Sequence, residues 1–581
     1  MNHTQHLNPR LRERGGIMKR FITVLLAVIV ASLFIAPFGG NNPVLAMDTA
    51  IGGNDEAGSF LSHVTDGLVS GESKINIESY GLDRDTFLSY MGALYNYEPL
   101  TFLVSRAFSY THYKSVVTAI TFKPVFEQDM IPDVLSLYEN AIDDCLKGIH
   151  GDWPLEAKLL HIFEYICNNF VYDYDCLIED VYNFINEKKG VCQAYSLFAA
   201  GVLDRLGIEN DTVISYSLNH IWNRVKLNGN WYCIDFTWGC DEVAGNVSHE
   251  NFLRAETNEG LPTDFARIHI GDEYDWKSTL SADDNATEDV YKTANACWYD
   301  TDTSFVFCNG YWYYLAEIKN NKIAFRRTTD FYVYETITSI TDYFYTESGS
   351  HWNGYFGGIM ALGTNVIFTT AKHVVLYNTV TGEFETLYVY DGDEVNCIYG
   401  MSGNGKVLNL YVRNYPPTSS AGDDVYKVET ITFEIPEEYT VPEELTEFAE
   451  RIEYYLDEET GTRYLFGITE GSFPGTLMAA IGGEARTYKD KEFSKSAVLT
   501  TGSIFRMGEL EYRVSIPGDT DCNGKVNGED AEFLLTAMLN PDYFTVYYEQ
   551  DYDGNGGFDL DDSIYLSESV GDPEGHPIDI K

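Results

Sequence analysis

The chain has 581 residues, 39 of them basic and 89 acidic, which gives a formal net charge of −50. Hydrophobic residues make up 44% and charged residues 22%, values that are ordinary for globular proteins and exclude global disorder and a polytopic membrane protein. The charge argues against nucleic-acid binding, because neutralising phosphates needs clustered Lys and Arg. A chain of this length predicts several domains of ~100–200 residues each.

The first residues have the layout of a secretory signal. Lys19 and Arg20 precede an apolar run over residues 21–36, and Val44 and Ala46 occupy the −3 and −1 positions of a small-residue cleavage site. The apolar run is short for a bilayer span of ~20 residues, although an uncleaved membrane anchor is the alternative. We therefore expect an exported protein that is secreted and extracellular.

The middle of the chain changes character twice. Residues 131–190 show the apolar spacing of helices. Between about 290 and 435, short alternating runs rich in Tyr, Val, Ile and Thr are separated by Gly, Asn and Asp turns, which predicts an all-β domain. Its recurring aromatic units allow propeller-like blades, although their period is irregular. Alternating aromatic residues can line a ligand groove but are more typical of a core.

Ten cysteines are scattered through the chain without a CxxC pair or a zinc-ligand spacing. One of them, Cys192, follows the helix-breaking Gly190 and opens the run QAYSLFAAGVLDRLGI, whose apolar spacing predicts an amphipathic helix. A thiol at a helix N-terminus meets the positive end of the helix dipole, which favours the thiolate. This is the environment of a nucleophilic cysteine, whereas a cysteine taken alone is more often a buried core thiol.

A β-hairpin is predicted downstream of this helix. The run HIWNRVKL alternates, Asn228-Gly229 is a strong turn signal, and NWYCIDF continues extended. In the register that this turn sets, His220 faces Thr237 and Trp222 faces Asp235, so Asp235 is the diagonal neighbour of His220 on the same face of the ladder. A carboxylate placed there can hold one ring nitrogen of the imidazole and leave the other for a thiol.

Cys192, His220 and Asp235 are therefore the predicted catalytic residues, acting as nucleophile, base and orienting group. The stretches GVCQAYS and HIWNRVKLNGNWYCIDFTWGCD resemble the transglutaminase-like superfamily of papain-like fold, and the flanking EAKLLHIFEYICNNFVYDYD and SHENFL resemble its bacterial members. The resemblance covers about residues 150–270 and places the family's catalytic Cys, His and Asp on these three positions. It implies a nucleophile-bearing helix packed against an antiparallel sheet. The sequence has HIW where the family commonly has HAW, which leaves the histidine in place.

The resemblance also implies amide chemistry through a thioester. Water as the acceptor gives proteolysis or deamidation, and an amine gives cross-linking. We favour hydrolysis of a protein or peptide substrate, because bacterial relatives with this short core are more often regarded as peptidases. A non-enzymatic binding module with a vestigial thiol is the rival hypothesis. The oxyanion donor is not fixed by the motif, and Gln193 and Tyr172 are the candidates.

The C-terminus holds an internal duplication: DTDCNGKVNGED at Asp519–Asp530 and, 32 residues later, DYDGNGGFDLDD at Asp551–Asp562. Oxygen-bearing side chains at positions 1, 3, 5, 9 and 12, glycine at position 6 and a carbonyl at position 7 are typical of calcium. The apolar position 8, Val526 or Phe558, suggests a loop packed on its twin, whereas an acidic disordered tail is the alternative. The predicted ligands are Asp519, Asp521, Asn523, Lys525, Asn527 and Asp530, then Asp551, Asp553, Asn555, Gly557, Asp559 and Asp562.

Each loop is followed by an apolar helix, ends with Asp rather than Glu, and lacks the entering helix of an EF-hand. Over residues 517–571 the arrangement resembles a type I dockerin, a module that attaches enzymes to cohesin modules of scaffoldins or cell-surface proteins. The resemblance implies two calcium ions, a cohesin partner and membership of a cellulosome-type complex, with no cofactor for the thiol chemistry.

We therefore expect a multidomain α+β protein. Its predicted parts are a signal peptide (1–46), an N-terminal helical or irregular region (47–130), a transglutaminase-like catalytic domain (131–285), a β-rich accessory domain (286–440), a linker with a small β module (441–516) and a helical, calcium-binding dockerin (517–581).

Overall fold

The computed structural model describes most of the chain beyond the signal-like segment. The described residues are 55–215, 218–240, 246–259, 261–269, 276–278, 286–318, 322–341, 344–345, 351–352, 357–392, 396–413, 428–458, 460–486, 498–539 and 560–571. The predicted signal peptide and residues 551–559 of the second acidic loop lie outside this set. No helix within the described ranges is both long and apolar enough to cross a membrane.

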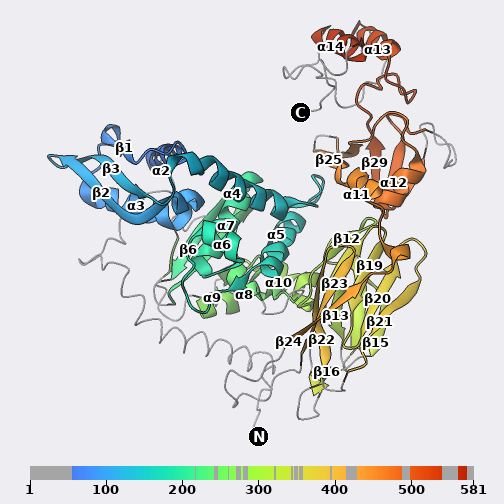
Figure 1. The fold of residues 1–581 in the computed structure, drawn as a ribbon, viewed down its shortest axis with the longest axis horizontal. Coiled ribbons are helices and arrows are strands. Elements are labelled where there is room, and N and C mark those ends of the chain that lie inside the picture. Colours follow the sequence, from blue (N-terminus) through green and yellow to red (C-terminus); the bar gives the residue numbers. More distant parts are fainter. Residues whose placement is uncertain are drawn as a thin grey trace.

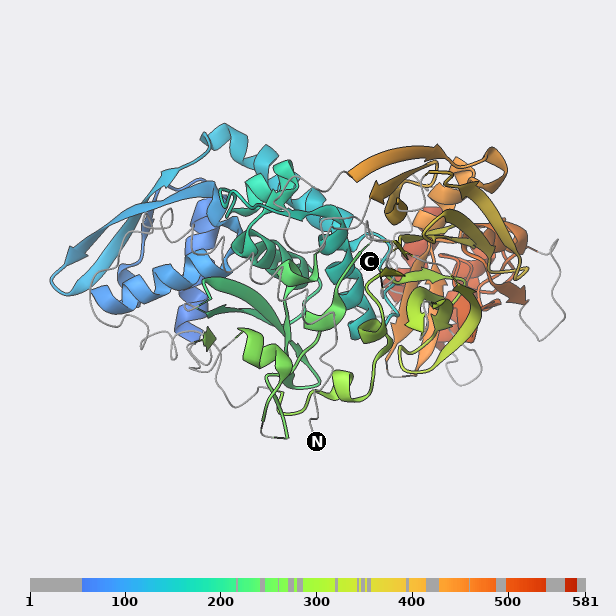
Figure 2. The same cartoon turned by 90° about the horizontal axis from the view of Figure 1, so that it is seen from below.

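The N-terminal part of the described chain contains α2 (Asp55–Val69), α3 (Arg84–Tyr97) and a three-stranded sheet of order β1-β3-β2. Its strands are β1 (Lys74–Asn76), β2 (Val104–Tyr113) and β3 (Val116–Pro124). The β2–β3 hairpin extends away from the rest of the chain (Figure 1, Figure 2). One continuous apolar core includes Phe60 in α2 and reaches Phe331. Residues 55–130 therefore share their core with the helices that follow them.

The next part places helices against an antiparallel sheet, as the family resemblance implies. The sheet has the order β11-β6-β7-β8. Its strands are β6 (Asn210–Ser215), β7 (His220–Leu227), β8 (Asn230–Ile234) and β11 (Trp276–Ser278). The helices are α4 (Ile131–Leu146), α5 (Leu155–Asn169), α6 (Val181–Glu187), α7 (Cys192–Arg205), α8 (Phe236–Gly239), α9 (Asp264–His269) and α10 (Val290–Thr293), with short pairs β4 (Val171–Tyr172) and β5 (Lys189–Gly190), and β9 (Thr257–Asn258) and β10 (Leu261–Pro262).

The helix α7 begins at Cys192, as predicted, but the expectation that it is amphipathic is wrong. Every residue from Ala194 to Leu203 is buried. The helix contacts α3, α4, α5, α6 and α8 as well as β6 and β7, so it has no solvent-facing side over this stretch. The sequence spacing marked only one apolar face, but the remaining positions, which include Tyr195 and Phe198, are covered by the neighbouring helices and strands.

The described residues between 306 and 434 form consecutive antiparallel strands, which confirms the all-β prediction for this region. The three main sheets have the orders β12-β13-β14-β15, β18-β19-β20-β21 and β22-β23-β24. Aromatic residues such as Tyr313, Phe325 and Phe368 are fully buried in the core, where they pack on one another. A propeller-like arrangement stays a prediction. The strands are β12 (Val306–Cys308), β13 (Tyr311–Ile318), β14 (Lys322–Thr328), β15 (Tyr334–Thr341), β16 (Phe344–Tyr345), β17 (His351–Trp352), β18 (Ile359–Leu362), β19 (Asn365–Thr369), β20 (His373–Asn378), β21 (Phe384–Val389), β22 (Cys397–Gly403), β23 (Val407–Arg413) and β24 (Val428–Glu434).

A smaller β module follows, with its own core and the strand order β25-β26-β29-β28-β27. It packs on the helical part of the chain: Tyr512 donates a 2.8 Å hydrogen bond to the buried Asp152, which also lies 3.3 Å from Arg463. Helices α13 and α14 then pair at the C-terminal end (Figure 1). These elements are α11 (Glu443–Glu450), β25 (Glu453–Asp457), β26 (Thr462–Phe466), α12 (Pro474–Ile481), β27 (Glu484–Arg486), β28 (Ile504–Met507), β29 (Leu510–Val514), α13 (Gly528–Leu539) and α14 (Leu560–Gly571).

Candidate functional site

The thiol of Cys192 stands at the first residue of α7, where a close turn brings the chain into the helix. A side chain at Gly190 would place its Cβ 2.6 Å from Phe184 Cδ2 and 2.9 Å from the Cβ of Ala194. Glycine is therefore the residue that lets this turn approach α6 and α7 so closely. The Cys192 side chain is partly exposed, and the N–H groups of the first helical turn have no partners within the helix.

Two buried hydrogen bonds fasten α7 to the strand that carries His220. Ser196 Oγ donates to the carbonyl of Ile221 at 3.2 Å, and Asn223 Nδ2 donates to the carbonyl of Ser196 at 3.0 Å. Because Ser196 lies one helical turn after Cys192 and Ile221 follows His220, these bonds fix the distance between the thiol and the imidazole.

The β7–β8 hairpin has the predicted turn and the predicted register. Leu227 pairs with Asn230, and Asn228 and Gly229 have φ angles of 51° and 82°, which a two-residue type I′ turn requires. The ladder stops where Asn223 faces Ile234, at the end of β8. The predicted register is therefore confirmed from the turn to Asn223 and Ile234, but the strands do not pair beyond these residues.

The predicted pairs of His220 with Thr237 and of Trp222 with Asp235 are wrong. Asp235 is the N-cap of α8, and its Oδ1 accepts the backbone N–H groups of Thr237 and Trp238 at 3.0 Å each. This capping turns the chain into a helix, which removes residues 236–239 from the ladder.

Asp235 nevertheless meets His220 as expected. Its Oδ2 lies 2.7 Å from His220 Nε2, the carboxylate is fully buried, and His220 is 7% exposed. His220 also hydrogen-bonds the side chain of Cys192. Because Nε2 faces Asp235, Nδ1 is the ring nitrogen left for the thiol. The structure thus brings the side chains of Cys192, His220 and Asp235 together.

The charges of the pair reinforce each other. Burial lowers the pKa of His220, but the negative charge of Asp235 and hydrogen bonds to Asp235 and Cys192 outweigh burial and raise that pKa to about 10. Burial raises the pKa of Asp235, yet the His220 charge and the hydrogen bonds from His220 and His269 hold it well below its usual value. At neutral pH the site therefore contains an imidazolium bound to a carboxylate.

Two residues of the site, His269 and Trp238, were not predicted from the sequence. His269 Nε2 lies 2.9 Å from the same Oδ2 of Asp235. Trp238 packs on both imidazoles, with ring centroids 4.8 Å from His220 and 4.3 Å from His269. His269 lies in α9, and neither hairpin pairing nor helical spacing connects that helix to Asp235. For Trp238 the only available signal was its place three residues after the aspartate.

The rim of the site is partly built by the N-terminal region. Gln193 Oε1 accepts a 2.6 Å hydrogen bond from Arg106, and Gln193 Nε2 donates to the carbonyl of Tyr95 at 3.0 Å. The side chain of Gln193 is therefore engaged by residues of β2 and α3, which leaves its backbone N–H as the group that could face an oxyanion. Tyr172 lies close enough to Cys192 to interact electrostatically, and burial raises the pKa of its hydroxyl, which stays a donor.

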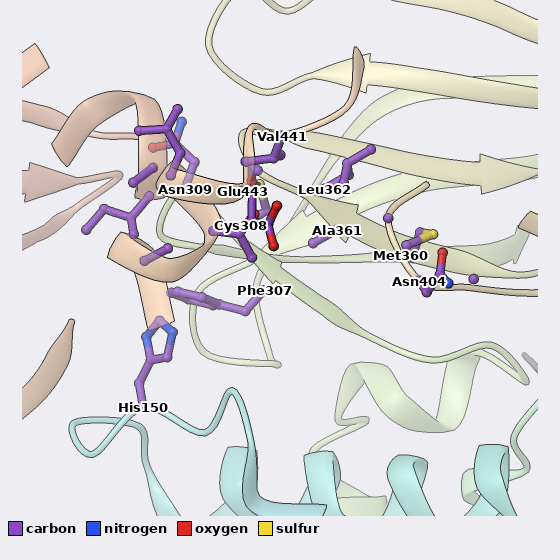
Figure 3. A pocket seen from close by; sticks show the side chains of 18 of the residues that line it. His150, Phe307, Cys308, Asn309, Met360, Ala361, Leu362, Asn404, Val441 and Glu443 are labelled. Carbon is purple, nitrogen blue, oxygen red and sulfur yellow. Dashed lines mark hydrogen bonds between the residues drawn. The ribbon is translucent and has the colours of Figure 1, made fainter. Parts of the chain in front are cut away.

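A cavity of 590 Å³ lies elsewhere, where the helical domain, the β-rich domain and the small β module meet. Figure 3 shows His150 pointing toward Phe307 at its edge. His150 stacks on Tyr454 with ring centroids 3.6 Å apart. The lining of this cavity does not include Cys192, so it is separate from the thiol site.

The first acidic loop brings its carboxylates together. Oxygens of Asp519, Asp521 and Asp530 all lie within 4.8 Å of one another, a spread that one calcium ion with ligands at 2.3–2.6 Å can span. Gly524 has a φ of 83°, as the sharp turn at position 6 requires, and its N–H donates to Asp519. Asp519 and Asp530 are buried, so these residues fit a cation.

The expectation that the loop packs on its twin through Val526 stays a prediction, because residues 551–559 of the twin loop lie outside the described residues. Val526 packs on the core of the small β module, and the backbone N–H of Thr501 in that module donates to Asp519 at 2.7 Å. The described helices of the two duplicated units touch, because Leu534 of α13 and Leu566 of α14 share a small core. Of the second set of ligands only Asp562 is described, and it is buried.

Comparison with known proteins agrees with the site. Residues 146–236 match the family model of the transglutaminase-like superfamily core. The kyphoscoliosis peptidase of Mus musculus is 27% identical over a match that covers 23% of this chain and 23% of that protein. The chain therefore matches about a quarter of the length of this curated relative.

Two solved structures were also found. One, described as a TGase, is 15% identical, with 23% of this chain and 44% of that chain covered and a TM-score of 0.17. A protein from Cytophaga hutchinsonii, provisionally described as a cysteine protease, is 16% identical, with 30% of this chain and 71% of that chain covered and a TM-score of 0.16. Residues 146–236, which match the model of the transglutaminase-like core, include Cys192, His220 and Asp235.

Proposed function

We propose that the helical domain over residues 131–285 is a thiol enzyme that hydrolyses peptide or amide bonds. The observation that carries the proposal is the line from Cys192 through His220 to the buried Asp235, at the start of a helix and within a transglutaminase-like core. Such a line supplies a nucleophile, a proton carrier and the group that orients it.

In the first step the Cys192 thiolate attacks the carbonyl carbon of the substrate amide. The electron pair of the carbonyl moves to oxygen, where the free backbone N–H groups at the start of α7 and the Tyr172 hydroxyl are candidate donors. The tetrahedral species then collapses, the C–N bond breaks, and the leaving amine takes the proton that the His220 imidazolium holds. The products of this step are the free amine and a thioester on Cys192.

In the second step the neutral His220 takes a proton from water as the oxygen attacks the thioester. The C–S bond breaks, the acid product leaves, and the thiolate–imidazolium pair forms again. Asp235 keeps the imidazole oriented in both steps. An amine in place of water would give a cross-link by the same route, so the acceptor distinguishes the leading function from its alternative.

The proposal is tested by incubating a proteome-derived peptide library with the wild type and with Cys192→Ala. We expect new peptide termini with the wild type and none with the variant. Incorporation of a labelled amine with release of ammonia, in place of cleavage, would favour cross-linking. Iodoacetamide separates both from a binding module: selective alkylation of Cys192 that is lost in His220→Ala identifies an activated thiol, and its absence would support a vestigial one.

A second proposal concerns the C-terminal region, because three carboxylates of the first acidic loop converge on one point. We propose that residues 517–581 form a type I dockerin that binds two calcium ions and a cohesin of a scaffoldin or cell-surface protein. In this hypothesis the enzyme is exported and joins a cellulosome-type complex. Asp519, Asp521, Asn523, Lys525, Asn527 and Asp530 would hold the first ion, with the second loop holding the other.

This second proposal has its own test. Calcium titration of the full chain by calorimetry should give two sites, and excess chelator should abolish binding to a cohesin panel. Cohesin binding that survives the chelator would contradict the dockerin hypothesis and would leave the thiol enzyme untouched.

A further inference from the structure

We infer that His269 is a positioning residue of the thiol site: it fills the second acceptor position of Asp235 Oδ2 and keeps that carboxylate turned toward His220. The inference rests on the proposed function, because the orientation of Asp235 matters only if the Cys192–His220 pair does chemistry. His269 lies outside the residues that match the family model.

All acceptor positions of the Asp235 carboxylate are occupied. A carboxylate offers about four lone-pair positions. Two on Oδ1 take the N–H groups of Thr237 and Trp238, and two on Oδ2 take His220 at 2.7 Å and His269 at 2.9 Å. Because Asp235 is fully buried, losing any one donor leaves part of a buried charge unsatisfied.

Packing keeps the His269 ring from turning away from Asp235. Its ring is fully buried and stacks on Phe265 with centroids 3.8 Å apart, while Trp222 lies at 5.1 Å and Trp238 at 4.3 Å. Its Nδ1 faces the carbonyl of Phe265 at 3.1 Å, a contact that does not hold the ring when the single hydrogen of a neutral imidazole lies on Nε2. The imidazole is therefore held rigidly with Nε2 toward Asp235, which is the arrangement that a donor with a fixed direction needs.

The surroundings of His269 determine which ring nitrogen carries its hydrogen. Burial lowers the pKa of His269, so the ring is neutral at neutral pH and carries one N–H. A carboxylate is a stronger acceptor than a carbonyl, which places that hydrogen on Nε2. A neutral donor adds no positive charge beside His220, so Asp235 keeps its full attraction for the His220 imidazolium.

Packing alone does not explain a histidine at this position. The surrounding rings of Phe265, Trp222 and Trp238 would accept a phenylalanine, and a buried polar ring is costly unless it makes its hydrogen bonds. What phenylalanine could not do is donate to Asp235. Without that donor the carboxylate is free to shift or to admit water, and the alignment of His220 with the thiol is lost.

The test compares His269→Phe, which keeps a ring but has no donor, with His269→Gln, which keeps an N–H donor but has no ring. Peptide hydrolysis and the rate of Cys192 alkylation by iodoacetamide are measured for both, with thermal melting as the control for folding. For His269→Phe we expect kcat to fall ~10–100-fold with KM unchanged, and for His269→Gln we expect kcat within ~3-fold of wild type.

Equal activity of His269→Phe and the wild type would overturn the inference, as would equal losses in both variants that follow their melting temperatures. If His269→Phe does not fold, the wild type is labelled with ¹⁵N-histidine and the tautomer of His269 is determined by NMR. We expect the neutral Nε2–H form, and the Nδ1–H form would contradict the assignment. If Cys192 is alkylated rapidly in the wild type and slowly in His269→Phe, but no peptide is cleaved, only the proposed hydrolysis is overturned.

Discussion

The thiol site and the first acidic loop are built in opposite ways. The thiol site gathers Cys192, His220, Asp235 and His269 from four elements that are far apart in the sequence, and each of its charges has a partner inside the fold. The acidic loop takes its ligands from twelve consecutive residues, Asp519–Asp530, and its three converging side chains are all carboxylates.

This difference shows where each site obtains its order. Tertiary packing holds the thiol site in place before any substrate arrives, because every lone pair of Asp235 is already occupied. In the proposed calcium site, the acidic loop would take a cation from solution to balance its carboxylates. The two regions should therefore respond to different perturbations, and each experiment below tests whether they are independent.

The largest effect is expected from His220→Ala. This change removes both the group that protonates the leaving amine and the cation beside the thiolate, so peptide hydrolysis should slow by ~10³–10⁴-fold. Steady-state cleavage of a selected peptide measures it. The matched control is Asp521→Ala in the acidic loop, which should leave the rate within twofold. A His220→Ala rate within tenfold of wild type would mean that another group carries the proton.

Calcium removal should have the next largest effect, and only at the other end of the chain. A free calcium concentration of ~100–1,000 times the dissociation constant stabilises the folded state by ~3–4 kcal/mol. Removal of calcium by a chelator should therefore expose residues 519–530. Hydrogen exchange of these amides, with and without chelator, measures the change. The amides of α7 are the internal control and should not change. Slowed hydrolysis on chelation would show that the two regions are coupled.

Gly190→Ala should disturb the thiol site through packing. The added methyl group meets Phe184 and Ala194 at distances below van der Waals contact, which should cost about 1–3 kcal/mol of the free energy of unfolding. The control is Gly92→Ala in α3, where nothing lies within 4 Å of the new Cβ, so stability should stay equal or rise by ~0.5–1 kcal/mol. Urea unfolding measures both. Equal stabilities would show that the turn before Cys192 can yield.

How much the sequence could predict follows the same division. The sequence predicted the features that depend on neighbours within a few positions, namely the helix start at Cys192, the Asn228-Gly229 turn and the acidic loop. His220 and Asp235 meet as predicted, although the ladder of the hairpin ends at Asn223 and Ile234, before it reaches either residue. The predicted ladder is wrong only from Asp235 onward, because this residue caps helix α8. The alternating pattern of the strand gave no sign of this helix cap.

What the sequence could not give is contact between distant segments. His269 reaches Asp235 through the packing of α9, and the N-terminal β2 strand reaches Gln193 through Arg106. The spacing of α7 suggested an exposed side that other helices cover in the fold. The contact of Val526 with the small β module was likewise not predicted. Each of these depends on which surfaces meet, and no periodicity records that.

The smallest expected effect is a pH dependence that belongs to the thiol site alone. The pKa of His220 is raised to about 10 in the fold, against ~6.5 for a free histidine. Because the folded state holds this proton more tightly, its contribution to stability is fully present below about pH 6.5 and is lost as the pH rises through about 10.

Hydrolysis needs the same proton for the leaving amine, so kcat should fall ~tenfold for each pH unit above about 10. Alkylation of Cys192 by iodoacetamide needs no proton and should not fall with it. Rate profiles of both reactions between pH 6 and 11 measure the contrast, and a loss of hydrolysis already near pH 7 would mean that Asp235 does not hold the imidazolium.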